Sequence, residues 1–292
     1  MTYFLELNPI KIKRLIFLNF LRTDKIGGAI MTIYRLSRRK FLIVAGSLTI
    51  TSMAGGAAAL DSLLGEERKK SKYRWAMFVD AAKCTECIRS IGLDGKPPCV
   101  IACDRENNVP EFGDKLRDPQ WIKIIGIRCE LSDEVIFFPL MCQHCEHPAC
   151  AEVCLSKATF VREDGIVMID YHRCIGCRYC IVACPFGVRS FNWYPPEEGL
   201  SEINPLVQTR GHGIVEKCTF CVERIDKEVY QAEREGRKPN PVPACVEACP
   251  YNALVFGNIL DPDSEVYKMV VKYKPIRLRA ELGTNPSVYY KL

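Results

Sequence analysis

Sixteen of the 17 cysteines in this 292-residue chain fall into four sets of four. In every set two residues separate the first two cysteines, and three residues separate the last two. Set one is Cys84, Cys87, Cys99 and Cys103; set two is Cys142, Cys145, Cys150 and Cys154; set three is Cys174, Cys177, Cys180 and Cys184; set four is Cys218, Cys221, Cys245 and Cys249. A recurrence of this kind requires a fold that gathers thiols in groups.

Set three has the spacing of a bacterial ferredoxin, C-x2-C-x2-C-x3-C followed by Pro185. Its tight loop can wrap three thiolates around one iron–sulfur cubane, while the fourth cysteine ligates the other cluster of a pair. Pro250 follows set four in the same way. The four sets therefore predict four [4Fe–4S] clusters.

Three other uses of cysteine compete with this interpretation. An exported chain can form disulfides, zinc sites also use C-x2-C pairs, and isolated cysteines are often simply buried. None of these explains a fourfold recurrence of the same first and last spacing. Cys129 belongs to no set and lies in an apolar, strand-like segment, so we expect it to be a buried structural thiol.

The N-terminal region, 1–59, is predicted to be a leader. Arg38-Arg39 precedes an uncharged run from Phe41 to Leu60 with small residues near its end, which is typical of a twin-arginine (Tat) export signal. The alternative is a retained signal anchor, because the run is long enough to span a bilayer. Met31 lies at a normal distance before the arginines, and it is a candidate for the true start.

The charge of the chain is concentrated in this leader. Residues 1–59 hold nine Lys and Arg against two acids, whereas residues 60–292 hold 31 against 33. The nearly neutral body argues against a nucleic-acid-binding face, which would need clustered cations.

The pattern along the body predicts an α+β fold. A hairpin is expected at 159–170 around Asp164-Gly165, with short helices following Cys150 and Cys180. Strands are expected at 75–80 and 252–257, and a helix at 222–235. We expect two bacterial-ferredoxin-like modules with two clusters each, joined by long loops. Segments 74–140 and 205–260 (sets one and four) form an outer module, 141–195 (sets two and three) is inserted in it, and 261–292 is a C-terminal tail.

Several segments resemble one family. They are the run from His172 to Cys180, Lys217-Cys218-Thr219-Phe220-Cys221, and the tail from Leu282 to Tyr290. Over residues 74–292 the chain resembles the four-cluster ferredoxin subunits of membrane oxidoreductases, such as the electron-transfer subunits of dimethyl sulfoxide and polysulfide reductases. Arg74-Trp75-Ala76-Met77 and the run from Glu106 to Pro110 are most similar to the periplasmic ferredoxin subunit of the Dsr-type, or Hdr-like menaquinol-oxidising, complex.

The resemblance implies that each cluster takes three cysteines from one set and the last cysteine of another. Cluster 1 would have Cys84, Cys87, Cys99 and Cys249; cluster 2 Cys218, Cys221, Cys245 and Cys103; cluster 3 Cys142, Cys145, Cys150 and Cys184; cluster 4 Cys174, Cys177, Cys180 and Cys154. His144 and His147 lie among these cysteines, and we expect them to support the ligands or to lie on the loop surface rather than to bind iron.

We find no nucleophile–base pair and no nucleotide-binding loop, so the chain is expected to move single electrons without bond chemistry of its own and to have no catalytic residue. The resemblance implies a subunit at the outer face of the cytoplasmic membrane, between menaquinol at a polytopic membrane subunit and a multihaem c-type cytochrome. Two alternatives are an electron-transfer subunit of an exported molybdopterin oxidoreductase and a zinc-stabilised interaction module.

Overall fold

The computed structural model describes residues 3–4, 71–92, 95–128 and 134–292. The expected leader, with Met31 and the twin arginines, lies outside the described residues except for Tyr3 and Phe4, and so does Cys129. Within the described ranges, no helix is long and apolar enough to cross a membrane.

A three-stranded sheet joins the two ends of the described body. β2 (Trp75–Asp80) is its central strand, paired antiparallel with β9 (Leu254–Asn258) and parallel with β10 (Val288–Lys291). The strand predicted at 75–80 is confirmed, and the one predicted at 252–257 begins two residues later than expected. The strand before set one therefore lies beside the strand after set four, and the C-terminal segment adds the third strand.

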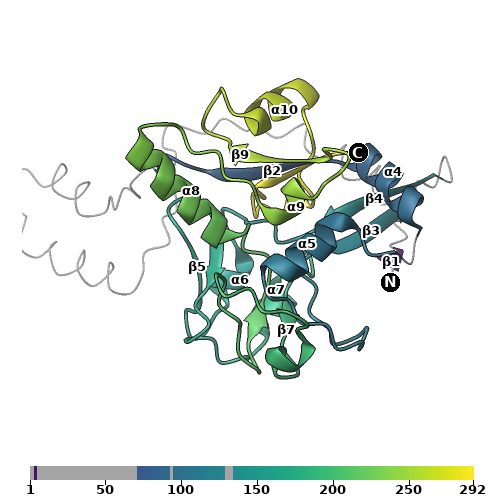
Figure 1. Ribbon diagram of the computed structural model, residues 1–292, viewed down its shortest axis with the longest axis vertical. Coiled ribbons are helices and arrows are strands. Elements are labelled where there is room, and N and C mark those ends of the chain that lie inside the picture. Colours follow the sequence, from purple (N-terminus) through teal and green to yellow (C-terminus); the bar gives the residue numbers. More distant parts are fainter. Residues whose placement is uncertain (1–2, 5–70, 93–94, 129–133) are drawn as a thin grey trace, which may run out of the picture. The chain divides into compact units, whose positions relative to one another are not determined.

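Both faces of β2 are buried. Successive side chains of a strand point to opposite faces, and Trp75, Met77 and Val79 enter the main core while Ala76 and Phe78 pack on the other side. There α10 (Glu265–Tyr273) lies beside the sheet, as Figure 1 shows, and its Val266 packs against Ala76 and Phe78. The main core on the opposite side contains cysteines from sets one, two and four.

A second sheet has the order β1 (Tyr3–Phe4), β3 (Lys123–Arg128) and β4 (Val135–Leu140). Helix α4 (Ala81–Ile91) packs on β4, and the hydroxyl of Thr85 accepts a 2.8 Å hydrogen bond from the backbone N–H of Phe137. The Asp80 side chain caps this helix by accepting from the backbone N–H of Lys83. Helix α4 was not anticipated from the sequence, and it carries the first two cysteines of set one.

The last two cysteines of set one lie on α5 (Pro98–Glu106). This helix begins at a proline, which suits the first helical position because the missing N–H would have no partner there. It packs against α9 (Ala244–Glu247), the short helix that carries Cys245. Sets one and four therefore meet helix to helix.

The hairpin between sets two and three is confirmed. β5 (Thr159–Val161) pairs antiparallel with β6 (Val167–Ile169), and Gly165 takes φ +86° in the turn. The expected short helices are α6 (Ala149–Glu152) and α7 (Tyr179–Ala183). Each begins one residue before its cysteine rather than after it, and the expected order of helix, hairpin and helix is confirmed.

The remaining elements connect the sets. β7 (Ser190–Phe191) pairs with β8 (Val215–Glu216), and the single-turn helices are η1 (Pro196–Gly199) and η2 (Ala280–Leu282). Helix α8 (Val222–Glu235) has the predicted bounds. It ends where Gly236 adopts a left-handed conformation with φ +69°, as glycine commonly does after a helix.

A structural repeat links the second and fourth sets. Both α6 and α9 follow a proline, carry the sequence Ala-Cys-x-Glu, and end just before the last cysteine of their set. Three residues after that cysteine, Lys157 and Asn252 both have positive φ, +56° and +48°. A strand then follows in each case. The same helix–turn–strand unit therefore presents two cysteines at each place.

Candidate iron–sulfur sites

Four cysteines line each of three cavities. Site 1 is lined by Cys84, Cys87, Cys99 and Cys249; site 3 by Cys142, Cys145, Cys150 and Cys184; site 4 by Cys154, Cys174, Cys177 and Cys180. The three cavities are similar in size. Each cavity combines three cysteines of one set with the last cysteine of another.

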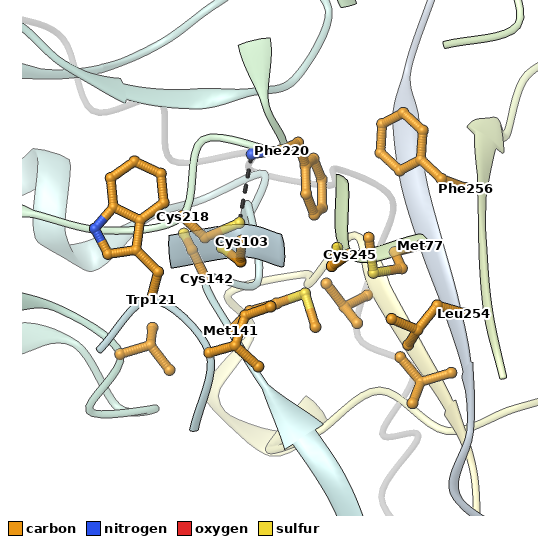
Figure 2. Packing of buried hydrophobic residues seen from close by; sticks show 14 of the residues in the cluster. Met77, Cys103, Trp121, Met141, Cys142, Cys218, Phe220, Cys245, Leu254 and Phe256 are labelled. Atoms are coloured by element: carbon orange, nitrogen blue, oxygen red, sulfur yellow. Dashed lines mark hydrogen bonds between the residues drawn. The ribbon is translucent and has the colours of Figure 1, made fainter. Parts of the chain in front are cut away.

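Site 2 consists of Cys103, Cys218, Cys221 and Cys245, all of them buried. Burial, followed by the nearby thiols of the other three, raises the pKa of the Cys103 thiol well above its ordinary value. The side-chain amide of Asn107 donates to the sulfurs of Cys103 and Cys221, at 3.7 and 3.6 Å. Figure 2 shows Cys103 and Cys218 in this part of the core. All sixteen cysteines of the described chain are free thiols, with no disulfide among them.

The surroundings of these thiols fit an iron–sulfur core, which carries positive charge before its thiolate ligands are counted. Burial and the neighbouring Cys142 raise the pKa of Cys145 to about 12, and burial and Cys249 raise that of Cys99 to about 12. Four thiolates packed into apolar surroundings repel one another and lose solvation, so they need a positive group among them. An iron–sulfur core supplies that charge and takes four thiolates.

Backbone N–H groups also point at the sulfurs. The N–H of Phe220 donates to Cys218 at 3.4 Å, a contact drawn in Figure 2, and the N–H of Ala253 donates to Cys249 at 3.3 Å. The N–H of Thr159 donates to Cys154 at 3.4 Å. Such bonds stabilise thiolate charge and are typical of iron–sulfur sites. Among the described residues, no group of three or more His, Cys, Asp or Glu side chains is arranged to hold a single metal ion.

The four sites form a row. The Cys245 thiol of site 2 has a pKa well above the ordinary value because it is buried and because Cys221, Cys218 and then Cys99 of site 1 lie near. Cys218 of site 2 likewise interacts with Cys142 of site 3, and both are labelled in Figure 2. Arg189 lines both site 3 and site 4. The order along the row is therefore site 1, site 2, site 3 and site 4.

The two histidines among the set-two cysteines differ in environment. His144 is fully buried, accepts a 3.1 Å hydrogen bond at Nδ1 from the N–H of Val167, and stacks on Phe220. Burial, with a smaller effect of the Lys217 charge, lowers the pKa of His144 well below its ordinary value, so the ring is neutral. His147 is exposed. Neither ring is among the residues lining sites 1, 3 and 4.

Sequence reasoning missed three polar side chains next to the sulfurs: Asn107, Arg189 and Lys217. Asn107 contacts site 2, and the guanidinium of Arg189 donates to Cys150 of site 3 at 2.9 Å. Lys217 stands beside Cys218 in the sequence, which was the only available signal. Asn107 and Arg189 lie four or more residues from the cysteines they contact, so spacing alone does not reveal them.

Comparison with known proteins agrees with this geometry. Residues 133–197 and 173–253 each match a model described as a 4Fe-4S dicluster domain. The Hdr-like menaquinol oxidoreductase iron-sulfur subunit 1 of Archaeoglobus fulgidus is 50% identical over 268 residues, covering 87% of this chain and 97% of that protein.

Two further relatives are more distant. The menaquinone reductase iron-sulfur cluster-binding subunit of Nitratidesulfovibrio vulgaris is 37% identical, covering 76% of this chain and 90% of that protein. A tetrathionate reductase subunit of Salmonella typhimurium is 33% identical, covering 87% of each. With sixteen cysteines grouped for four [4Fe–4S] clusters, the chain belongs to the family of iron–sulfur electron-transfer subunits of menaquinol oxidoreductases and related reductases.

Proposed function

We propose that this chain conducts electrons between menaquinol, reached through a polytopic membrane subunit, and a multihaem c-type cytochrome. The observation that carries the proposal is the row of four tetracysteine sites within one folded unit. The name of the archaeal relative, which is 50% identical, supports menaquinol as the quinone. When bound, each cluster supplies a one-electron redox couple.

The proposed ligands are the cysteines of sites 1 to 4, each site holding one cluster. This assignment makes sets one and four an outer ferredoxin-like module, interrupted by the module of sets two and three. The pairing of β2 with β9 and the packing of α5 on α9 support the outer module. The hairpin β5–β6 and the packing of α6 on α7 support the inserted one.

The chain's own residues shield the clusters and stabilise their charge. Site 1 is lined, besides its cysteines, by apolar groups such as Phe138, Pro139 and Leu254. These groups exclude water and lower the local dielectric, while the N–H donors described above offset the thiolate charge. Such fixed surroundings need little rearrangement when the charge of a cluster changes.

One end of the row reaches an exposed apolar surface. Cys177 of site 4 is exposed, and around it Ile175, Tyr179 and Val182 expose 66%, 56% and 85% of their surface. Apolar side chains gathered on a surface in this way mark docking sites. We place the membrane subunit here, because its contact with site 4 would let an electron enter or leave at the end of the row.

The charge of the body suits a cationic partner at the other end. Residues 60–292 have 31 Lys and Arg against 33 acids, and four oxidised clusters with their thiolates would add about −8 by formal counting. A basic docking surface on the cytochrome complements this charge. The twin-arginine leader would place the folded protein on the outer face of the cytoplasmic membrane.

A pull-down of the detergent-solubilised native protein tests the proposal. We expect recovery of a polytopic membrane subunit and a haem protein, with reduction of the clusters by a menaquinol analogue. The similarity to the tetrathionate reductase subunit favours a second candidate, the electron-transfer subunit of an exported molybdopterin oxidoreductase. Recovery with a molybdopterin subunit alone would support that candidate, and a free monomer would contradict both.

A further inference from the structure

Two buried cations have no carboxylate partner among the residues that the structure describes. Among the described residues three cationic side chains are buried: Arg189, Arg210 and Lys217, with exposed fractions of 4%, 1% and 1%. Arg210 forms a 2.7 Å ion pair with Glu216. For Arg189 and Lys217 no ion pair occurs within the described part of the chain. A buried charge is costly unless it is compensated, so these two require negative charge from another source.

Arg189 lies at the junction of sites 3 and 4. Its guanidinium donates to the sulfur of Cys150 at 2.9 Å and to the hydroxyl of Thr159 at 3.3 Å. The side chain lines both cavities, and its charge acts on the Cys180 thiol of site 4. One positive charge is thus shared by two neighbouring sites.

Lys217 lies at the junction of sites 2 and 3. Its ammonium donates to the carbonyl oxygen of Cys218 at 2.9 Å and to that of Val167 at 2.5 Å. Cys218 belongs to site 2, and Val167 lines site 3. The ammonium acts electrostatically on the thiols of both Cys218 and Cys150.

Sites 1 and 2 also have acidic neighbours, which sites 3 and 4 lack among the charges that act on their thiols. Asp80, which forms a 2.8 Å ion pair with Lys291, acts on the Cys84 thiol of site 1. Site 2 has Asp104, which is ion-paired with Lys96, beside Cys103. Glu106 acts on Cys221 and is partly offset by Arg224. Counted by buried cations without a carboxylate partner, the row is therefore asymmetric among the described residues: site 3 has two, sites 2 and 4 have one each, and site 1 has none. The exposed Arg178 also lines site 4.

We propose that Arg189 and Lys217 set the reduction potentials along the row, so that the site 3 cluster is reduced first and the site 1 cluster last. A one-electron reduction adds one negative charge to the cluster and makes or breaks no bond. A buried cation nearby favours the more negative state, because the low local dielectric strengthens the attraction. The inference rests on the ligand assignment proposed above.

Potentiometric titration of the purified holoprotein with dithionite, followed by electron paramagnetic resonance, tests the order of reduction. The variants Cys99→Ser and Cys145→Ser assign the signals of sites 1 and 3. We expect the signal altered by Cys145→Ser to develop at the highest potential and that altered by Cys99→Ser at the lowest. The reverse order overturns the inference, whereas two ligand variants that alter the same signal overturn the ligand assignment instead.

Charge variants test the two residues directly. In Arg189→Gln we expect the ratio of reduced to oxidised cluster at a fixed potential to fall about tenfold in sites 3 and 4, about 59 mV for a one-electron couple, with site 1 unchanged. Lys217→Met should have the same effect on sites 2 and 3. In Arg189→Lys, which keeps the positive charge, the ratio of reduced to oxidised cluster should stay near that of the parent protein.

Lys268→Met removes an exposed lysine on α10 and is the matched control. Iron content identifies any charge variant that has lost a cluster. If a variant has lost one, the order of reduction measured in the parent protein tests the inference in its place. Equal shifts of the reduction potential at all four sites contradict the inference, and so does the absence of any shift in a variant that holds all four clusters.

Discussion

At the scale of single residues, the tightest constraint on the set-three loop is Gly176. Its φ is +66°, and a Cβ placed there would lie 2.0 Å from the carbonyl oxygen of Gly213. Because the obstacle is backbone, no side chain can rotate away. The glycine lets the loop between Cys174 and Cys177 lie directly against the segment before β8.

Gly176→Ala should therefore displace the loop that holds site 4. We expect the variant to lose roughly a quarter of its iron, that of one cubane among four, measured per chain after purification without oxygen. Gly187→Ala is the matched control, because Gly187 has a similar φ of +61° but no atom within 4 Å of an added Cβ. Equal iron in the two variants would contradict the role given to the close approach.

At the scale of elements, local signals predicted more than long-range ones. The hairpin and α8 were predictable because the Asp164-Gly165 turn and the residues at the helix end act over a few positions. The helical placement of Cys84 and Cys87 was not, because α4 is stabilised by packing on β4, which is distant in sequence. The pairing of β10 with β2 likewise depends on residues that are more than 200 positions apart.

The same distinction holds for the sites. The spacing of cysteines predicts clusters and their number, but it does not determine which last cysteine completes which site; that grouping came from a family resemblance. The positions of Arg189 and Lys217 between sites follow from three-dimensional packing. The sequence shows only that Lys217 adjoins Cys218, and it does not show that either cation lies between two sites.

The grouping predicts an effect across modules. Cys249→Ser should damage the cluster of site 1, where Cys249 lies beside Cys84 and Cys99, and should leave the site 2 cluster intact. Cys103→Ser is the reciprocal variant and should damage site 2 alone. Electron paramagnetic resonance of the reduced proteins distinguishes damage at site 1 from damage at site 2. Damage by Cys249→Ser confined to site 2, which holds the first three cysteines of set four, would refute the crossed assignment.

The exposed apolar surface on and beside α7 predicts a docking effect. Val182→Asp places a charge where 85% of the side chain is exposed near site 4. If a partner covers this surface, the buried charge should weaken association about tenfold or more, equivalent to about 1.4 kcal/mol. Val271→Asp changes a valine of 58% exposure on α10 and is the control. Co-purification of the membrane subunit measures both, and equal recovery would argue against docking at α7.

At the scale of the whole molecule, the proposed leader would determine where the electron path operates. Replacing Arg38 and Arg39 by lysine should leave the protein in the cytoplasm with its clusters assembled, because the Tat machinery recognises the arginine pair. Fractionation of cells with antibody detection checks this. Export at the parent level would count against a Tat signal, and sequencing the mature N-terminus near Leu60 separates cleavage from anchoring.

Four cubanes in one folded unit are the basis of every function proposed for this chain. The most direct test is the iron and acid-labile sulfide content of the anaerobically purified protein. We expect about sixteen iron and sixteen sulfide per chain, four of each for every cluster, in a brown protein free of zinc. Zinc in place of iron, or about half that amount of iron and sulfide, would contradict the presence of four [4Fe–4S] clusters.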